Sequence, residues 1–304
     1  MDDTAIKSQL FELNQNISGL INRANEEIPA AAAFNDRQKI CEISQKRLDD
    51  DRLRMAVVGT IKSGKSTFIN SLFAGDYLKR GAGVITSIVT RVRRSERLRT
   101  VLYFKSWEEI NQEINQALVI FPSNTWRSAD EAFDIRKSRD RTELAEALDA
   151  LESRHLLTRD SRNVNSVLLA AYLKGYDTVK DIVSSGTETV TYDGDRFGEH
   201  KAYVSSEFLA VYLKDIALEI NTGDMESNIE IADCQGSDSP NPLHLAMIQD
   251  YLRTADLVVY LISSRTGLRQ ADIKFLTMIE NMVGMSHLLF VVNCDFNEHE
   301  STQD

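Results

Sequence analysis

Hydrophobic residues at the start of the chain follow the period of a helix. Between residues 5 and 28, apolar side chains recur at alternating steps of four and three, which places them on one helical face. They are Ile6, Leu10, Leu13, Ile17, Leu20, Ala24 and Ile28. After Pro29 interrupts this pattern, Asn35 with Gln38 three residues later predicts the cap of a second helix. We therefore expect a helical segment over residues 1–52, whose stripe packs either on the adjacent domain or in a helical bundle.

From residue 53 onward the pattern changes to short apolar runs that alternate with helical stretches. The runs that best predict strands lie at 53–58, 101–104, 229–232, 257–262 and 288–292. The last two are almost wholly apolar, which is typical of strands covered on both faces. Helices are predicted near 106–118, 142–155 and 165–183, from Asn241 to about Arg253, and over 268–283. This alternation predicts an α/β domain over residues 53–304, with a mostly parallel sheet flanked by helices. Residues 105–205 exceed what such a fold requires, so we expect a helical insertion there, at one edge of the sheet.

The segment between the first strand and the next helix fits the pattern G-x-x-x-x-G-K-[ST]. It reads Gly59, Thr60, Ile61, Lys62, Ser63, Gly64, Lys65 and Ser66, with Thr67 following in the helix. Backbone N–H groups of such a loop and the helix N-terminus form a cradle for phosphates. Lys65 would reach the β- and γ-phosphates, and Ser66 would bind Mg²⁺. A glycine–serine turn ahead of a helix could match by chance, but the required order of strand, loop and helix favours a P-loop.

Two further positions complete the pattern of a nucleotide hydrolase. A loop hydroxyl that binds Mg²⁺ is expected at Thr86, and a strand-end acid followed by a glycine is expected at Asp233 and Gly236. Each signal is weak alone, because threonines in loops and D-x-x-G strings are common. Their order behind the P-loop strengthens both.

The charge of the chain argues against nucleic acid as a partner. The formal net charge is −11, although Lys79, Arg80, Arg91, Arg93, Arg94, Arg97 and Arg99 crowd one segment. That segment could meet phosphates or an acidic partner, or it could be the solvated face of a loop and an edge strand. The three cysteines are far apart and support neither a disulfide framework nor a zinc site. With an acidic start and no apolar run long enough to span a bilayer, the chain is expected in a reducing cytoplasm.

The P-loop and the segment from Gly81 to Thr90 resemble the GTPase domain of the dynamin superfamily, and of its bacterial dynamin-like proteins in particular. The resemblance covers residues 53–104 and 205–296. It implies Mg²⁺-dependent GTP hydrolysis with Lys65, Thr86 and Gly236 as catalytic residues, and with Ser66, Thr86 and Asp233 as metal ligands. It also implies that the two N-terminal helices resemble the helical neck of the family. A homodimer through the nucleotide face, membrane remodelling and a cytoplasmic or peripheral inner-membrane location are further implications, with membrane contact made by regions absent from this chain.

The sequence departs from this family at several positions. The base-reading motif reads Asn293-Cys294-Asp295, with cysteine in place of lysine and the acid one place early. Asp295 is either the guanine-reading carboxylate or a surface-loop acid. Ile61 stands where a polar residue helps to place water, and Lys62 is either a source of positive charge for hydrolysis or a solvent-facing lysine. Two alternatives therefore remain open: a slow or non-hydrolysing switch that recruits a protein, and an ATP-using P-loop enzyme. The family also predicts one more strand and helix after residue 296, so we expect a truncated chain.

Overall fold

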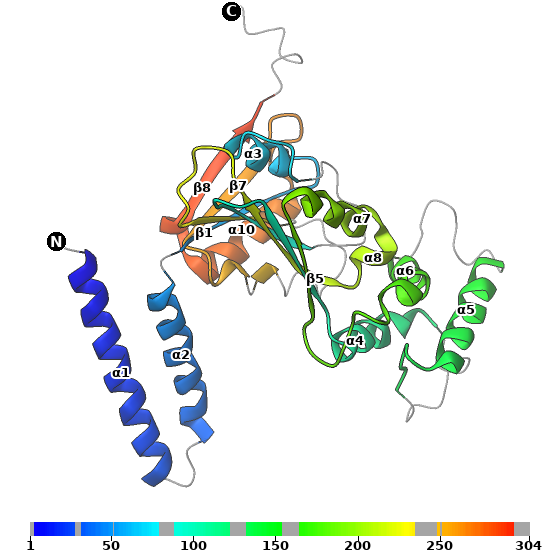
Figure 1. Cartoon of the computed structure of the whole chain (residues 1–304), viewed down its shortest axis with the longest axis horizontal. Coiled ribbons are helices and arrows are strands. Elements are labelled where there is room, and N and C mark those ends of the chain that lie inside the picture. Colours follow the sequence, from blue (N-terminus) through cyan, green and yellow to red (C-terminus); the bar gives the residue numbers. More distant parts are fainter. Residues whose placement is uncertain are drawn as a thin grey trace, which may run out of the picture. The chain divides into compact units, whose positions relative to one another are not determined.

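The computed structural model describes residues 3–27, 32–50, 52–78, 88–121, 132–153, 164–234, 248–249 and 251–294. The chain forms two compact units, Met1–Arg52 and Leu53–Asp304 (Figure 1). None of the helices in these described parts is both long enough and apolar enough to cross a membrane.

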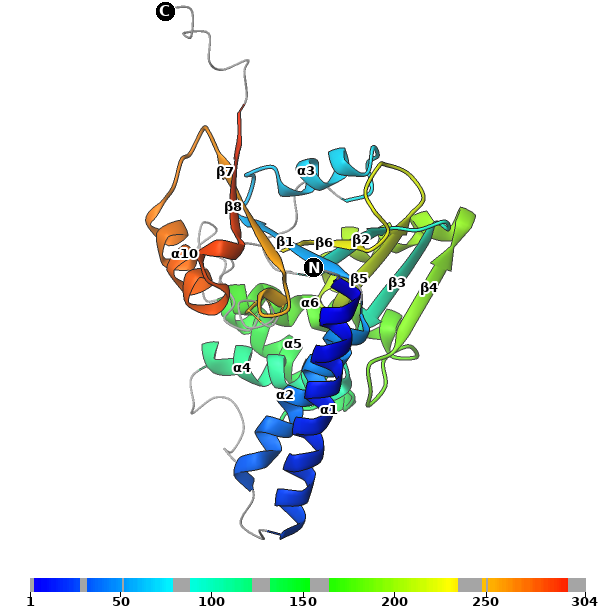
Figure 2. The ribbon, with the colours of Figure 1, turned by 90° about the vertical axis from the view of Figure 1, so that its left-hand side faces the viewer.

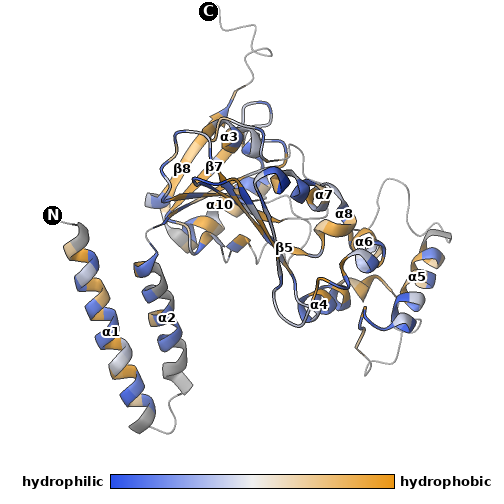
Figure 3. Ribbon diagram, in the orientation of Figure 1, coloured by the Kyte–Doolittle hydropathy of each residue, from blue (hydrophilic) through white to orange (hydrophobic). Residues whose placement is uncertain are grey.

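The first unit is a helical hairpin. Helices α1 (Asp3–Glu27) and α2 (Ala32–Asp49) run side by side, with Ile21 and Cys41 buried between them. Asn14 Nδ2 on α1 donates to Cys41 O and to Gln45 Oε1 on α2, both at 3.0 Å. Figure 3 shows hydrophobic positions recurring among hydrophilic ones along α1. Much of this apolar stripe is exposed, including Leu13 and Leu20.

The start of the second helix differs from the prediction. Helix α2 begins at Ala32, so Asn35 lies inside the helix and the predicted cap at Asn35 is wrong. Alanine has the highest helix propensity of all residues, and the alanines before Asn35 therefore extend the helix.

The second unit is built on one eight-stranded sheet with the order β4-β3-β5-β2-β6-β1-β7-β8 (Figure 2). The strands are β1 (Leu53–Gly59), β2 (Val89–Arg94), β3 (Arg99–Phe104), β4 (Thr189–Asp193), β5 (Leu213–Ile220), β6 (Ile229–Asp233), β7 (Leu257–Ser263) and β8 (Leu288–Asn293). Strands β6, β1, β7 and β8 are parallel neighbours, and β2 is parallel to β5. The β2–β6, β3–β5 and β3–β4 pairings are antiparallel. The predicted α/β fold with a flanked sheet is confirmed, and its parallel part surrounds β1.

Alternate residues of β1 enter two hydrophobic cores on opposite faces of the sheet. Val57 packs in the core that includes Ile69 of α3 (Lys65–Leu72). Ala56 and Val58 pack in the other core, with Phe275 of α10 (Gln270–Val283). Since the last four residues of β1 are buried, the loop that follows them is held at a fixed place.

The region 105–205 is mainly helical, as predicted, but it also supplies the edge strand β4. Its helices are α4 (Trp107–Ala117), η1 (Leu118–Ile120), α5 (Ser138–Ser153), α6 (Val164–Val179), η2 (Gly194–Glu199) and α7 (His200–Ser205). The short α8 (Glu207–Ala210) follows them, and η3 (Met285–His287) precedes β8. Of the helix predicted from Asn241 to about Arg253, residues 248–249 and 251–252 are described and helical, and 241–247 lie outside the described residues. The polar composition of 184–195 concealed β4, in which Val190 and Tyr192 alternate with threonines. Trp107 is buried and contacts the ring of Tyr176, whereas Trp126 lies outside the described residues.

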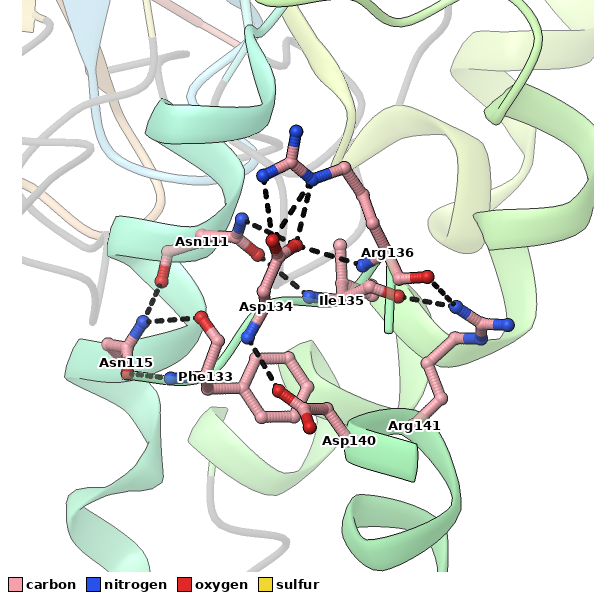
Figure 4. Close-up of polar contacts among 8 residues, drawn as sticks. All are labelled: Asn111, Asn115, Phe133, Asp134, Ile135, Arg136, Asp140 and Arg141. Carbon is pink, nitrogen blue, oxygen red and sulfur yellow. Dashed lines mark hydrogen bonds and ion pairs between the residues drawn. The ribbon is translucent and has the colours of Figure 1, made fainter. Parts of the chain in front are cut away.

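A polar network joins the segment before α5 to its neighbouring helices (Figure 4). Asp134 binds the guanidinium of Arg136 and the Asn111 amide of α4, and the Arg136 hydrogen bonds lower the pKa of Asp134 to about 2. Arg141 of α5 donates to Ile135 O at 2.7 Å. These bonds fix the segment 133–136 between two helices.

The arginines of β2 are part of the sheet rather than of an edge. Strand β2 lies between β5 and β6, so the predicted edge strand is wrong. Arg91 forms ion pairs with Asp215 of β5 and Glu230 of β6, and Arg93 pairs with Glu219 of β5. Acids on neighbouring strands therefore compensate charges that looked like a basic patch in the sequence.

Candidate nucleotide-binding site

The P-loop follows β1 at the carboxyl end of the parallel strands. Gly59 has φ 150°, and a Cβ atom there would lie 2.4 Å from Leu261 O of β7, the residue paired with it. Gly64 has φ 99°, and its Cβ would lie 2.3 Å from Asn293 Nδ2 of β8. Both positions require glycine because of left-handed backbone and close neighbours. Strands β7 and β8 thus shape the loop.

Lys65 places its ammonium group inside the loop. Its Nζ donates to Gly59 O at 2.8 Å and to Thr60 O at 2.9 Å, and the residue is 8% exposed. Ser63 is fully buried, and its hydroxyl has no partner among the described residues. Buried polar groups are nearly always satisfied by a protein group, water or ligand, so this hydroxyl is available to a ligand in the loop.

The metal ligands predicted on two different elements lie together. Ser66 Oγ, in the first turn of α3, donates to Asp233 Oδ2 at the end of β6 over 2.7 Å. Ligand oxygens at 2.0–2.1 Å from Mg²⁺ in an octahedron are about 2.9 Å from their neighbours, so this pair fits adjacent positions around the ion. Burial raises the pKa of Asp233, while the Ser66 hydrogen bond and the charge of Lys65 act in the opposite direction.

Strand β2 passes beside Asp233, the predicted metal ligand on β6. Thr90 is paired with Asp233 in the antiparallel β2–β6 ladder. Thr86 lies four residues before Thr90, but Thr86 itself is outside the described residues, as is Gly236. Their predicted roles therefore stay predictions.

The strand that should carry the base-reading motif reaches the P-loop. Asn293 Nδ2, at the end of β8, donates to Ser63 O at 3.0 Å. Cys294 is exposed, and Asp295 lies outside the described residues. The end of β8 is thus held against the P-loop.

The remaining predicted residues lie around the rim of the loop. Lys62 is exposed and has left-handed backbone with φ 67°. Thr60 is buried, Ile61 is partly buried, and Thr67 is exposed on α3. The described residues contain no group of three or more His, Cys, Asp or Glu that could hold a metal ion.

Sequence reasoning missed the residues that support the loop from behind. Periodicity predicts Leu261 only as part of an apolar strand, although its carbonyl approaches Gly59 and its side chain lies 3.7 Å from a Cβ built at Gly64. The sequence around Thr90 does not indicate that this residue is paired with Asp233. The signal for both is strand pairing, which single-sequence periodicity does not supply.

Comparison with known proteins agrees with this geometry. The family model described as "Dynamin family" matches residues 55–295. The chain is similar to Dynamin-like protein A of Bacillus subtilis (strain 168), with 21% identity over 286 residues that cover 91% of this chain and 21% of that protein.

Two solved chains from an oligomerised bacterial dynamin pair are also similar, each at 15% identity, with TM-scores of 0.48 and 0.44. The matches cover 94% and 97% of this chain and 39% and 46% of those chains. The chain spans about a fifth of the length of Dynamin-like protein A. Because the family model matches residues 55–295, from β1 to just beyond β8, the chain belongs to the dynamin family.

Proposed function

We propose that this chain binds GTP with Mg²⁺ and hydrolyses it as a dynamin-type GTPase domain. The observation that carries the proposal is the 2.7 Å hydrogen bond between Ser66 Oγ and Asp233 Oδ2. It joins the phosphate loop to a second strand where the metal of a bound triphosphate would lie. Family membership supports GTP as the substrate.

Each residue of the site has a distinct role in this proposal. Loop N–H groups and the N-terminus of α3 bind the phosphates, and Lys65 neutralises the β- and γ-phosphate oxygens. Ser66 and Asp233 would hold Mg²⁺, which supplies further positive charge to those oxygens.

Thr86 and Gly236 are close enough along the chain to described residues of the site to act at the bound γ-phosphate. Thr86 is four residues from Thr90, so it lies within about 14 Å of the residue that pairs with Asp233. Gly236 is three residues from Asp233 and within about 11 Å of it. We propose that the Thr86 hydroxyl binds the metal and that the Gly236 N–H meets the γ-phosphate, and that together they order the attacking water.

The end of β8 would read the base. Asn293 is fixed to the P-loop through Ser63 O, and Asp295 follows two residues later. A carboxylate that accepts hydrogen bonds from N1 and the exocyclic amine distinguishes guanine from adenine. We propose Asp295 for this contact.

Calorimetry with GTP, GDP and ATP, each with Mg²⁺, tests substrate choice. We expect the guanine nucleotides to bind and ATP to bind at least tenfold more weakly, while Lys65→Ala removes binding. Lys180→Ala, an exposed lysine paired with Asp177 in the insertion, is the matched control. Tighter binding of ATP would refute guanine selectivity, and unchanged binding by Lys65→Ala would refute the P-loop assignment.

Hydrolysis needs its own measurement. A single-turnover assay at high protein concentration should convert GTP to GDP. If bound GTP stays intact under these conditions, the chain is a nucleotide switch and the enzymatic part of the proposal is wrong.

We further propose dimerisation through the nucleotide face, with Lys62 supplying positive charge at the β–γ bridge. Lys62 is exposed on the loop, and Leu268, in the turn after β7 at the same sheet edge, is 50% exposed. Sedimentation with GDP and aluminium fluoride should give a dimer, and Lys62→Ala should lower the stimulated turnover. A monomer in this state would contradict dimerisation through the nucleotide face. Full stimulated turnover by Lys62→Ala would contradict the role of Lys62.

Action at a membrane rests on family membership alone. We propose that the protein works in the cytoplasm, peripheral at the inner membrane face. Sedimentation with anionic liposomes tests this, and a chain that stays in the supernatant with and without GTP would contradict membrane contact by these residues.

A further inference from the structure

Strand β4 leaves one edge of the sheet open. It is the last strand in the order of the sheet, and among the described strands it pairs only with β3. Figure 2 shows β4 as the outermost strand on its side of the sheet. Tyr192 is buried in the core and Val190 packs against it, so the strand is held in place from one face. Its outer edge is therefore a fixed, extended backbone that no described strand covers.

The backbone groups on this outer edge belong to alternate residues. Gly194 N donates to Leu98 O at 2.8 Å, and the antiparallel ladder continues from this bond in steps of two residues. The even-numbered residues of β4 thus bond to β3. The N–H and C=O groups of Thr189, Thr191 and Asp193 point the other way, and no backbone group in the described part of the chain bonds to them. An added strand would find three donors and three acceptors here.

Strand β4 has few of the features that usually keep an edge strand from pairing. Proteins protect sheet edges with lysine, proline, bulges or a covering element. The sequence of β4 is Thr-Val-Thr-Tyr-Asp, without lysine or proline, and its register with β3 runs without a bulge. Its short length of five residues limits pairing but does not prevent it. The charges beside the strand therefore decide what can pair with it.

Acidic residues flank the open edge. The segment 184–195 has no lysine or arginine, and its exposed acids are Glu188, Asp193 and Asp195. Arg99 of β3 contacts Asp193 at 3.4 Å, yet the Asp193 side chain is 68% exposed. Arg196, which follows the segment, is paired with Glu199 at 2.7 Å. The segment thus carries a net negative charge that basic side chains on an added strand would meet.

The same charges act against a second copy of this chain as the added strand. In an antiparallel pair of two β4 strands centred on Thr191, Asp193 of one copy would lie opposite Thr189 of the other, next to Glu188. Like charges that face each other across a sheet are destabilising, whereas opposite charges stabilise it. A basic strand would gain at both ends of β4, where a second copy would lose.

We propose that β4 is a docking edge for a partner protein, which adds an extended segment with lysine or arginine beside Glu188 and Asp193. The added strand bonds to the outward backbone groups of β4 and extends the sheet. Backbone pairing supplies the affinity, and the flanking acids select the charge of the partner. Four strands of the sheet separate β4 from β1, which carries the P-loop, so the proposal does not depend on GTP binding.

A model peptide tests the proposal on the whole chain. The probe is a fluorescent peptide of sequence Lys-Thr-Val-Thr-Val-Thr-Lys, and its control has glutamate in place of both lysines. Fluorescence anisotropy should show that the basic peptide binds roughly tenfold more tightly than the acidic one. The basic peptide should slow hydrogen exchange at the amides of Thr189, Thr191 and Asp193. Exchange at Val190 and Tyr192, which already bond to β3, should change little.

Substitutions at the edge separate backbone pairing from charge. Thr191→Pro removes one outward donor and no bond to β3, so the strand should still form. It should weaken binding of the basic peptide roughly tenfold. Thr191→Val keeps the N–H group and should bind within about twofold of wild type. If Thr191→Pro does not fold, Glu188→Gln with Asp193→Asn tests the charges, and the preference for the basic peptide should fall from roughly tenfold to about twofold.

Several results would overturn the proposal. They are no binding of the basic peptide at about 1 mM, equal binding of the two peptides, and unchanged binding by Thr191→Pro. Protection of β8 in place of β4 would put the peptide at the other edge of the sheet and refute docking at β4. A dimer in sedimentation that Thr191→Pro abolishes would identify a second copy as the occupant, and the proposed basic partner would be wrong.

Discussion

Replacement of Gly64 by alanine tests how the P-loop is held against β8. The new Cβ would lie 2.3 Å from Asn293 Nδ2 and 3.2 Å from Asn293 Cγ. These atoms belong to the end of a side chain, so Asn293 can turn away. It would then lose its hydrogen bond to Ser63 O.

The expected cost has two parts. Left-handed backbone with φ 99° costs an alanine roughly 1–2 kcal/mol. The lost hydrogen bond adds about 0.5–1.5 kcal/mol, so Gly64→Ala should lower the free energy of unfolding by about 2–3 kcal/mol. In an Asn293→Ala background the hydrogen bond is already absent and the space is open. Gly64→Ala should then cost only the roughly 1–2 kcal/mol of backbone strain.

Urea unfolding of the wild type, both single variants and the double variant, without nucleotide, measures this coupling. The cost of Gly64→Ala should be about 1 kcal/mol smaller in the Asn293→Ala background. If the cost is equal in the two backgrounds, Asn293 does not restrict the loop and the reasoning fails. A cost below about 0.5 kcal/mol in wild type would show that the loop adapts to a side chain without strain.

Three further outcomes follow from the described contacts. Ser66→Ala should raise the Mg²⁺ concentration needed for binding of a fluorescent GTP analogue by roughly 10- to 100-fold, and an unchanged titration would exclude Ser66 as a ligand. Glu113→Gln leaves the buried Lys105 ammonium without its carboxylate and should cost about 3–5 kcal/mol in denaturant unfolding; Lys105→Met with Glu113→Leu should recover most of this, and an equally unstable double variant would contradict the assignment. Burial lowers the pKa of His200 from 6.5, so the unfolded state takes up its proton first as pH falls below 6.5 and stability declines; His200→Gln should weaken this decline in unfolding measured between about pH 7 and pH 5.

The sequence predicted the parts of the fold that depend on local pattern. Strands β1, β7 and β8 are apolar runs, and the P-loop is a contiguous motif with its own strand and helix. Their positions followed from composition and spacing alone. The adjacency of Ser66 and Asp233 followed from the family pattern, because the two residues are far apart in the chain.

The missed strands depend on partners elsewhere in the chain. In strand β5, buried Leu218 and Ile220 alternate with partly buried residues, a period of two that is typical of a strand but extends over only a few residues. The arginines of β2 conceal an internal strand, because the acids that compensate them lie on β5 and β6. Similarly, nothing around Asn70 in the sequence indicates that its buried amide hydrogen-bonds to the backbone of Tyr77 and Leu78.

The ion pairs between β2 and β5 constrain how the protein can vary. Arg91 meets Asp215, and Arg93 meets Glu219, on one face of the sheet. A substitution of Arg93 or Glu219 alone leaves an uncompensated charge on a partly covered surface, and loss of Arg91 leaves both Asp215 and Glu230 without their cation, whereas joint substitution of all the partners does not. We therefore expect these positions to be kept or replaced together among homologues. A chimera that takes β2 from one relative and β5 from another would combine strands whose charges are not matched.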